Sequence, residues 1–411
     1  MSHLQNFLSL ADFERAASRL LPRCVLGYVR GGTEDERSLS ENAAGFARLG
    51  FRPRGLRHVA TRQSTVKLWG CEYAMPIGIA PTGLAGLIQH DCDLHLAREA
   101  AHAQLPFIIS GSSSVPMEEL QSQVPGSWYQ AYFPGDPDRI AKIVKRLEAA
   151  RIDVLVVTMD TCVAANRENN VRMDFTIPFR LTPRLLLDGM LHPRWSLGVF
   201  ARTLLSRGVP RFANLYEEIG PPITEEPAHG FRTGRDALTW EHLKWLREQW
   251  RGKLVVKGLM HPDDATLALQ AGVDAIIVSN HGGRQLDGTV STLQALAEVV
   301  AVVPQEFPVF VDGGFRRGTD VLKAVALGAK MVFIGRPILY GAAVAGAAGI
   351  RRVLEIMRNE IDRDLALLGC KAIKEVTPDL LTPCAAPMVG TTYKQGLPLD
   401  PPRSVLMQPL E

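Results

Sequence analysis

The segment 279–288, with the sequence SNHGGRQLDG, combines residue types that suit acid–base chemistry on a substrate carrying a carboxylate. His281 can accept a proton, and Arg284 can hold a carboxylate through two parallel, charge-assisted hydrogen bonds. The glycines between them leave room for a flat ligand to approach the backbone. An isolated histidine and arginine at this spacing more often belong to an ordinary surface turn, so the interpretation depends on the rest of the chain.

Further polar residues follow apolar runs, each where a buried strand is expected to end. The candidate strands span 76–80, 106–109, 128–132, 154–159, 254–257, 274–279, 308–311 and 331–334. The polar residues at or just after their ends are Thr82, Ser110, Gln130, Tyr132, Thr158, Asp160, Lys257, Ser279, His281, Asp312 and Arg336. A single polar residue after a strand is common in loops, but a polar residue after every strand indicates that these residues share a site.

Helical patterns separate the strands and indicate a barrel. They lie at 93–103, 137–150, 263–271, 292–303 and 319–327. Strands and helices in this alternation, joined by right-handed crossovers, predict an α/β fold: a (β/α)8 TIM barrel with an N-terminal helical segment, as one domain over 1–411. An open, doubly wound sheet is the alternative, but its glycine-rich turn after the first strand is missing. The barrel would bring the polar residues to one rim.

Two glycine and arginine segments late in the chain suit a phosphate group. DGGFRRG at 312–318 follows the seventh candidate strand, and Gly335 with Arg336 follows the eighth. Backbone N–H groups at helix starts, backed by guanidinium groups, bind phosphate, and barrels commonly do so after these two strands. An arginine-rich surface turn is the alternative.

Two charged residues of the same rim need partners. Lys257 ends a buried strand, where an unpaired ammonium group is costly, so an anionic part of a cofactor would compensate it. Asp160 could orient His281 and stabilise its imidazolium form, and a structural role as a helix cap is the alternative.

Composition excludes several classes of function. The chain has 411 residues, 46% of them hydrophobic and 22% charged, and its net charge of +3 is too small for a nucleic-acid footprint. Its start lacks a secretory signal, and no uncharged apolar run reaches transmembrane length. The six cysteines have no metal-ligand spacing. We therefore expect a cytoplasmic protein with no metal and no nucleic-acid partner.

The chain resembles the FMN-dependent 2-hydroxy-acid dehydrogenase and oxidase family over roughly residues 21–376. The motifs VKG, SNHGGRQLDG, DGGFRRGTD, LGA and GRP occur in the family's order and spacing. This resemblance implies bound FMN, oxidation of a small 2-hydroxy acid to the 2-keto acid, an external electron acceptor (a quinone or oxygen) and a homo-oligomer, often a tetramer.

The resemblance also implies roles for individual residues. The catalytic positions are His281 as the base, Asp160 as its partner, and Tyr132. The substrate-binding positions are Tyr28, Tyr132, Arg167, Arg284 and Gly83, with the two arginines on the carboxylate. The flavin-binding positions are Pro81, Thr82, Gly83, Ser110, Gln130, Thr158, Lys257, Ser279, Asp312, Gly313, Gly314, Arg316, Gly335 and Arg336.

Within the family, the (S)-mandelate dehydrogenases are the most similar branch. Segment 187–197 (LDGMLHPRWSL), Gly83 and segment 360–363 (EIDR) carry this similarity. Ser112 and Ala164 stand where glycolate oxidase has large side chains, so an aromatic substituent on the 2-carbon would fit. An L-lactate dehydrogenase and an oxygen-using oxidase are the alternatives. A flavin-binding protein without activity is disfavoured because every acid–base and carboxylate-binding position is filled.

Two segments lie outside the barrel pattern. Segment 177–215, after the fourth strand, mixes leucines and aromatic residues with six arginines and one acid, Asp188. This composition predicts a segment that lies in an anionic membrane interface, and a lid packed on the barrel is the alternative. The proline-rich tail 377–411 is expected to be an extended arm, either disordered or wrapped over a neighbouring subunit.

Overall fold

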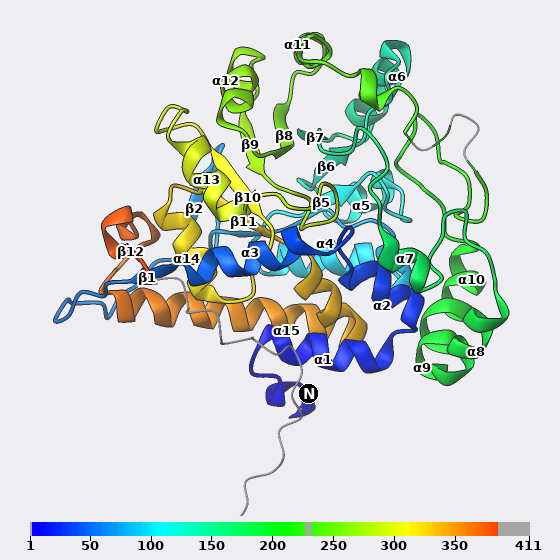
Figure 1. The fold of residues 1–411 in the computed structure, drawn as a ribbon, viewed down its shortest axis with the longest axis horizontal. Coiled ribbons are helices and arrows are strands. Elements are labelled where there is room, and N and C mark those ends of the chain that lie inside the picture. Colours follow the sequence, from blue (N-terminus) through cyan, green and yellow to red (C-terminus); the bar gives the residue numbers. More distant parts are fainter. Residues whose placement is uncertain (1, 227–229, 231, 385–411) are drawn as a thin grey trace, which may run out of the picture.

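An eight-stranded parallel sheet forms the centre of the molecule (Figure 1). The computed structural model describes residues 2–226, 230 and 232–384. The strands are β4 (Ile77–Ile79), β5 (Ile108–Ser110), β6 (Trp128–Ala131), β7 (Val154–Thr158), β8 (Lys253–Leu259), β9 (Ala275–Val278), β10 (Val309–Asp312) and β11 (Met331–Ile334). They pair in the order β4-β11-β10-β9-β8-β7-β6-β5.

The two edges of this sheet meet and close the barrel. Ile79 of β4 forms a parallel bridge with Phe107, and its N–H donates to the carbonyl of Pro106 at 2.9 Å. The predicted TIM barrel is therefore confirmed, and the open sheet is excluded. Each of the eight expected strands is present within two or three residues of its predicted ends.

Helices cover the outside of the barrel. The elements between the strands include α4 (Cys92–His102), α5 (Met117–Gln123), α6 (Pro137–Ala149), α11 (Trp240–Gln249), α12 (Pro262–Gln270), α13 (Thr292–Val300) and α14 (Gly318–Ala326). Local sequence fixes several helix starts: Asp136 accepts from the N–H of Asp138 at 3.0 Å, beside Pro137 at the first position of α6. The last helix, α15 (Arg336–Leu368), has a break in its helical backbone at Ala345 and Gly346.

The barrel interior is filled by aromatic residues at its N-terminal end. Trp128 and Phe310 pack there beneath Trp69, at ring-centroid distances of 5.4 and 6.0 Å from the Trp69 ring. Trp69 lies in the turn of a hairpin, β2 (Val66–Leu68) and β3 (Cys71–Tyr73). This hairpin covers one end of the barrel, which leaves the carboxyl ends of the strands as the open rim.

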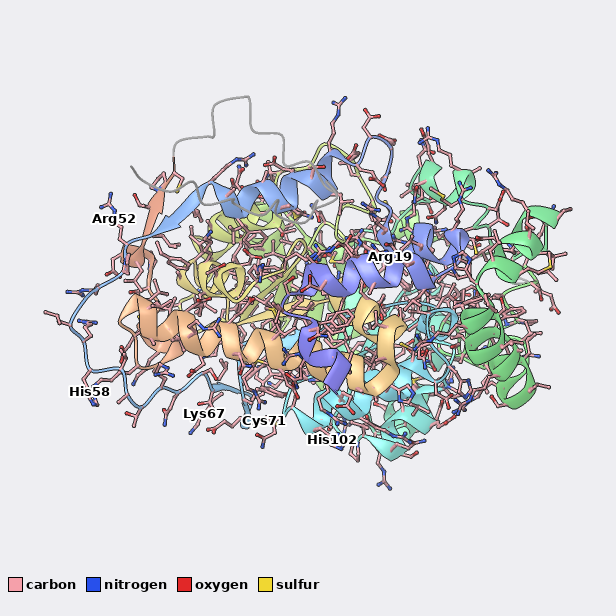
Figure 2. All side chains as sticks on the ribbon, turned by 90° about the horizontal axis from the view of Figure 1, so that it is seen from below. Arg19, Arg52, His58, Lys67, Cys71 and His102 are labelled. Atoms are coloured by element: carbon pink, nitrogen blue, oxygen red, sulfur yellow. The ribbon has the colours of Figure 1, made fainter. Side chains whose placement is uncertain are left out.

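The N-terminal segment is helical, as expected. It comprises η1 (Ser2–Asn6), α1 (Leu10–Leu20), α2 (Arg23–Arg30) and α3 (Arg37–Ala47). Helix α1 lies along α15, and Figures 1 and 2 both show the two side by side. Asn42 of α3 exchanges two side-chain hydrogen bonds with Asn280, at 2.8 and 3.0 Å, so α3 is bound directly to the loop that carries His281.

The chain returns to this N-terminal segment near its end. Strand β1 (Leu49–Phe51) pairs antiparallel with β12 (Leu381–Pro383), which follows the short helices η5 (Ile373–Glu375) and η6 (Pro378–Leu380). The first part of the predicted extended tail is thus part of the fold. Residues 385–411, the rest of that tail, lie outside the described residues.

The segment after β7 is helical for much of its length. It contains α7 (Glu168–Arg172), α8 (Pro183–Leu191), α9 (Pro193–Trp195), the π-helix η3 (Ser196–Ala201) and α10 (Arg202–Arg207), and η4 (Arg235–Ala237) follows later. One side of these helices packs on the barrel: Trp195 is buried, and its Nε1 donates to the carbonyl of Leu87, in η2 (Ala85–Leu87), at 2.7 Å. Within the described residues, no helix is long and apolar enough to cross a membrane.

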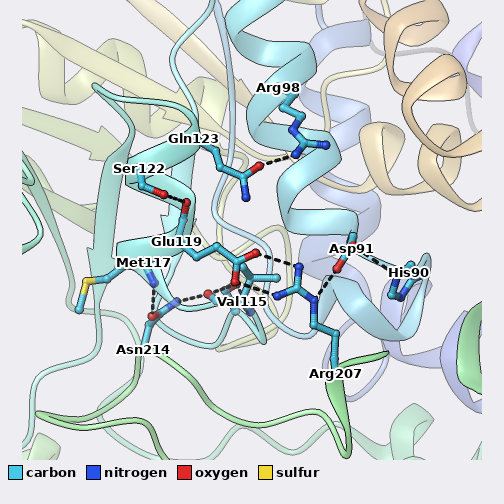
Figure 3. A network of polar contacts seen from close by, with 11 residues as sticks. His90, Asp91, Arg98, Val115, Met117, Glu119, Ser122, Gln123, Arg207 and Asn214 are labelled. Atoms are coloured by element: carbon cyan, nitrogen blue, oxygen red, sulfur yellow. Dashed lines mark hydrogen bonds and ion pairs between the residues drawn. The ribbon is translucent and has the colours of Figure 1, made fainter. Parts of the chain in front are cut away.

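Arg207 attaches the end of α10 to the barrel. Its guanidinium donates to Asp91 at 2.9 Å and to both carboxylate oxygens of Glu119 at 2.7 and 2.8 Å (Figure 3). His90, beside this cluster, is buried and its Nδ1 is 3.2 Å from the hydroxyl of Thr203 in α10. These contacts fix the insertion to α5 and to the loop that leads into α4.

Candidate active site

His281 and Asp160 form a buried pair at the open rim. The Nδ1 atom of His281 lies 2.9 Å from Oδ1 of Asp160. Burial lowers the pKa of His281 below its usual value despite the opposing charge of Asp160. Burial opposes ionisation of Asp160, but His281 keeps the pKa of this carboxyl below its usual value. An ionised Asp160 requires the proton on Nδ1, which leaves Nε2 of neutral His281 free to accept another.

Backbone geometry directs His281 into this position. Its φ is 57°, in the left-handed region, and its N–H donates to the hydroxyl of Ser279 at 3.0 Å. A left-handed backbone at a residue other than glycine is uncommon and costs free energy. The loop after β9 therefore turns sharply enough to place the imidazole over the rim.

A fixed positive charge lies beside this pair, across the ends of β8, β9 and β10. Lys257 is buried, and its Nζ lies 2.9 Å from Oδ2 of Asp312 and 2.8 Å from the hydroxyl of Ser279. Ser279 in turn donates to Oδ1 of Asp312 at 2.6 Å. Burial favours neutral Lys257, but Asp312 and Asp160 raise the pKa of this lysine above its usual value. The ammonium group therefore stays charged.

Arg284 and Arg167 lie next to each other without a carboxylate partner in the described part of the chain. One Nη of Arg284 donates to the carbonyls of Tyr28 and Gly31, each at 2.7 Å, and the guanidinium lies 5.1 Å from the centre of the Tyr28 ring. Arg167 donates from Nε to the carbonyl of Arg284 at 3.0 Å. Burial and the charge of Arg167 lower the pKa of Arg284 to about 9. Such an arrangement is suited to an external anion.

Glycines and two arginines form the opposite end of the site. Gly313 and Gly314 have φ values of 102° and 86°, and a Cβ on Gly314 would lie 2.8 Å from the carbonyl oxygen of Asn42. Arg336, at the start of α15, donates to the carbonyls of Val29, Gly282 and Gly31 at 2.9–3.1 Å. Burial lowers the pKa of Arg336 to about 10. With Arg316 nearby, this end can hold a phosphate.

One cavity of about 530 Å³ joins these groups. The predicted residues that line it are Tyr28, Pro81, Thr82, Gly83, Gln130, Tyr132, Thr158, Arg167, Lys257, His281, Arg284, Asp312, Gly313, Gly314, Arg316, Gly335 and Arg336. Ser110, Asp160 and Ser279 are not in this lining and contact residues that are. Ser112 and Ala164, the two small side chains expected to open space for substrate, also line the cavity.

The tyrosines and Gly83 lie together in the wall. Tyr28 donates its hydroxyl hydrogen to the carbonyl of Gly83 at 3.0 Å, and a Cβ on Gly83 would lie 2.9 Å from Cβ of Ser112. The rings of Tyr132 and His281 are 6.5 Å apart. Burial raises the pKa of Tyr132 above its usual value, so its phenol remains protonated at neutral pH.

The cavity wall fits FMN. Thr82 Oγ1, Gln130 Nε2 and Thr158 Oγ1 are buried there without a hydrogen-bond partner among the described residues. Buried polar atoms normally have partners, and the polar edge of a flavin ring supplies both donors and acceptors. Lys257 pairs with Thr158 in the register of β7 and β8 and lines the same cavity as the other two side chains. Because the glycine and arginine end suits a phosphate, the wall has partners for both ends of this cofactor.

Some lining residues were not predicted. Arg232, Arg235, Phe212 and Leu215 reach the cavity from the loop between α10 and α11. This loop follows β7, and the loops after barrel strands usually carry the site, so a contribution from it could be expected. Because the loop is long, the sequence does not show which of its residues return to the rim.

Comparison with known proteins gives a consistent picture. Residues 17–383 match the family model described as FMN-dependent dehydrogenase. The chain is 38% identical to (S)-mandelate dehydrogenase of Pseudomonas putida, over 92% of this chain and 94% of that protein. It is 34% identical to L-lactate dehydrogenase of Pseudomonas syringae pv. syringae, over 92% of this chain and 99% of that protein.

A solved structure is also similar. The crystal structure of the monotopic membrane protein (S)-mandelate dehydrogenase superposes with a TM-score of 0.83 and 36% identity, covering 92% of this chain and 99% of that one. The family match spans nearly the whole chain, and its cofactor is the one that the cavity wall fits. The chain therefore belongs to the family of FMN-dependent dehydrogenases.

Proposed function

We propose that this protein oxidises an (S)-2-hydroxy acid with an aromatic substituent, mandelate or a ring-substituted mandelate, to the 2-keto acid. The observation that carries this proposal is the buried pair of His281 and Asp160 in the same cavity as Arg167 and Arg284. A base in its neutral form beside two guanidinium groups that have no carboxylate partner suits a substrate whose C2 atom carries a carboxylate together with the hydrogen and the hydroxyl group that react.

Each residue has a defined task in the reaction. Arg167 and Arg284 hold the carboxylate, and Tyr28 and Tyr132 hydrogen-bond the hydroxyl group. His281 accepts a proton at Nε2, and Asp160 stabilises the imidazolium that results. Bound FMN supplies the two-electron acceptor.

The remaining predicted residues hold the cofactor. The ring is held by Pro81, Thr82, Gly83, Ser110, Gln130, Thr158, Lys257 and Ser279, and the phosphate end by Gly313, Gly314, Arg316, Gly335 and Arg336. Asp312, which is paired with Lys257 at 2.9 Å and directly precedes Gly313, holds the part of the cofactor between these two ends. Lys257 is charged and favours the negative charge that a flavin gains on reduction.

Two observations favour mandelate over lactate. Ser112 and Ala164 keep side chains short at the cavity wall, which leaves room there for a substituent larger than methyl. The similarity to (S)-mandelate dehydrogenase is also higher than that to the lactate dehydrogenase named above.

Anaerobic reduction of the bound flavin tests this proposal. We expect (S)-mandelate to bleach the flavin absorbance of the holoenzyme faster than L-lactate does, and His281→Gln to remain yellow. Faster bleaching by lactate would favour the lactate dehydrogenase alternative. The rates at which a quinone and oxygen reoxidise the reduced flavin then identify the electron acceptor. We propose that the acceptor is a quinone.

The insertion supports a peripheral membrane location. We define its apolar face as the exposed side chains Leu186, Leu187, Met190, Leu191, Leu197 and Leu205, which are 55–89% exposed. An exposed apolar patch of this extent normally marks an interface. Exposed arginines flank it, which suits the anionic inner surface of a bacterial membrane. We propose that the protein attaches to the cytoplasmic side of the membrane through this apolar face. We also propose that it is a homotetramer, and that the barrel and the insertion of each subunit form one domain.

A further inference from the structure

Two positively charged side chains of the cavity have no anionic partner in the described part of the protein, and none in the proposed cofactor or substrate carboxylate. Seven of the described residues that line it are arginine or lysine, and one, Asp312, is acidic. Two further acidic residues lie just outside the lining: Asp160 on His281, and Glu14 at 3.9 Å from Arg316. Asp312 is paired with Lys257 at 2.9 Å. A phosphate group carries a charge of about −1.5 to −2 and suits Arg316 and Arg336. One substrate carboxylate suits Arg167 and Arg284, which leaves two guanidinium groups of the cavity without an anion.

These two groups are Arg232 and Arg235. Neither makes a side-chain hydrogen bond or an ion pair within the described part of the chain, and Nε of Arg232 is buried without a partner. The guanidinium of Arg235 lies 4.9 Å from the centre of the Tyr132 ring. Burial and neighbouring positive charge, from Arg167 for Arg232 and from Arg232 for Arg235, lower the pKa of both arginines, that of Arg235 to about 10. Partly buried cations that repel one another are costly unless an anion binds them.

The backbone holds the two arginines in place. The N–H of Arg235 donates to the carbonyl of Arg232 at 3.1 Å, and Gly234 between them has a φ of 73°. The turn is fixed to the loop before α6, because the N–H of Gly135 donates to the carbonyl of Thr233 at 3.3 Å. A Cβ on Gly135 would lie 2.2 Å from the carbonyl oxygen of Gly234, so the two backbones are in direct contact. The arginines are therefore presented by a tight turn and not by a loosely held loop.

We propose that Arg232 and Arg235 bind a second acidic group of the substrate, so that the substrate is a 2-hydroxy acid with an additional carboxylate distant from the reacting carbon. The inference rests on the proposed function, since it assigns the first carboxylate to Arg167 and Arg284. The second carboxylate lies on the Tyr132 side of the cavity, and it pairs with the two guanidinium groups that have no other anion.

Matched pairs of substrates test the inference with the holoenzyme. The pairs are (S)-mandelate with (S)-4-carboxymandelate, and (S)-2-hydroxypentanoate with (S)-2-hydroxyglutarate. We expect kcat/KM of the wild type to favour the diacid in at least one pair. In Arg232→Gln/Arg235→Gln this preference falls by about 10- to 100-fold, the usual effect of hydrogen bonds to a charged group. The control is Arg211→Gln, an exposed arginine of the same loop that does not line the cavity, and it keeps the preference.

A binding measurement separates this inference from the proposed function. Calorimetry with 2-oxoglutarate and with 2-oxopentanoate needs no turnover, and tighter binding of the diacid that is lost in the double variant supports the second anion site. A wild type that prefers the monoacid in both pairs, or a preference that survives the double variant, overturns the inference. If flavin stays oxidised with all four substrates while the arginine-dependent binding of 2-oxoglutarate is present, the proposed oxidation fails and the anion site stands.

Discussion

At the scale of single residues, the bond between His281 and Asp160 decides which ring nitrogen can react. With the proton on Nδ1 directed to Asp160 at 2.9 Å, only Nε2 can accept a proton from substrate. Burial keeps the pKa of His281 below its usual value, so the neutral form is present at pH 7. At neutral pH, His281 is therefore already in the protonation state that a base requires.

This pair gives a pH-dependent prediction. As pH falls through the lowered pKa of His281, Nε2 becomes protonated, and kcat/KM is expected to fall on the acid side and to be constant near neutrality. Asp160→Asn removes the negative charge that partly offsets the effect of burial on the pKa of His281. The pKa of His281 therefore falls further, and the acid-side decline of kcat/KM moves to lower pH. The plateau also falls, by about 10- to 100-fold, because the imidazolium loses a charged partner. An acid limb that moves to higher pH would contradict this assignment, and Asp263→Asn, an 88% exposed carboxyl, serves as the control.

His281→Gln gives a second prediction at this scale. The side chain acts on substrate, so the variant should bind FMN normally and lose about 10²- to 10⁴-fold in kcat, the usual effect of removing a positioned base. Flavin content by absorbance and rapid-reaction bleaching with mandelate measure the two properties. A variant with near-normal turnover excludes His281 as the base.

Lys257 is expected to affect both the cofactor and the fold. Lys257→Met leaves Asp312 buried without its ion-pair partner, which typically costs about 3–5 kcal/mol of stability. Flavin content and the flavin reduction potential should fall in the same variant because a charge beside the cofactor is removed. The double variant Lys257→Met/Asp312→Asn should recover the denaturation midpoint but not the potential. Recovery of both would limit Lys257 to a structural role.

The small side chains of the cavity wall give a prediction about substrate size. Ala164→Leu should lower the ratio of kcat/KM for mandelate over lactate by about 10- to 200-fold, since one added side-chain volume in a pocket has an effect of this order. Val163→Leu is the control, because Val163 is 59% exposed and lies outside the cavity wall. If Ala164→Leu and Val163→Leu gave the same mandelate-to-lactate ratio of kcat/KM, the aromatic group of the substrate would not lie against Ala164.

At the scale of elements, the end of segment 177–215 packs into the barrel. Phe212 and Leu215, inside the expected segment 177–215, line the cavity, and Asn214 is fully buried and accepts from the N–H of Met117 at 2.7 Å. A Gly/Ser linker in place of 177–215 would therefore damage the barrel. Replacement of 183–207 alone, α8 through α10, should keep bound flavin and mandelate oxidation, and loss of both would show that these helices hold the site together.

The elements also show what sequence could predict. The strands were found because each is a short apolar run bounded by turn residues, a local signal. The contacts of Asn42 with Asn280, and of β1 with β12, join residues far apart in the chain and leave no periodic pattern. The tight turn that carries Arg235 into the cavity depends on contact with Gly135, which only the folded chain reveals.

At the scale of the whole molecule, the apolar face of the insertion predicts membrane binding. Leu187→Gln/Leu191→Gln/Leu205→Gln should move the protein from the membrane fraction to the soluble fraction at low salt, because exposed apolar side chains hold it in the interface. The matched triple variant Leu8→Gln/Leu56→Gln/Leu367→Gln changes three exposed leucines outside the insertion and should stay bound. A wild type that is already soluble at low salt would support a lid.

The N-terminal helices form hydrogen bonds with barrel residues that come late in the sequence, and this has a consequence for synthesis of the chain. Arg284 binds the carbonyls of Tyr28 and Gly31 across 256 and 253 residues, and Arg336 reaches Val29 across 307. At about 5–20 residues per second, translation of that interval takes roughly 10–60 s. During this time Leu10 and Phe13, buried in the finished fold, have no barrel to pack on. The nascent chain therefore keeps this apolar surface exposed until the last elements of the barrel have been synthesised.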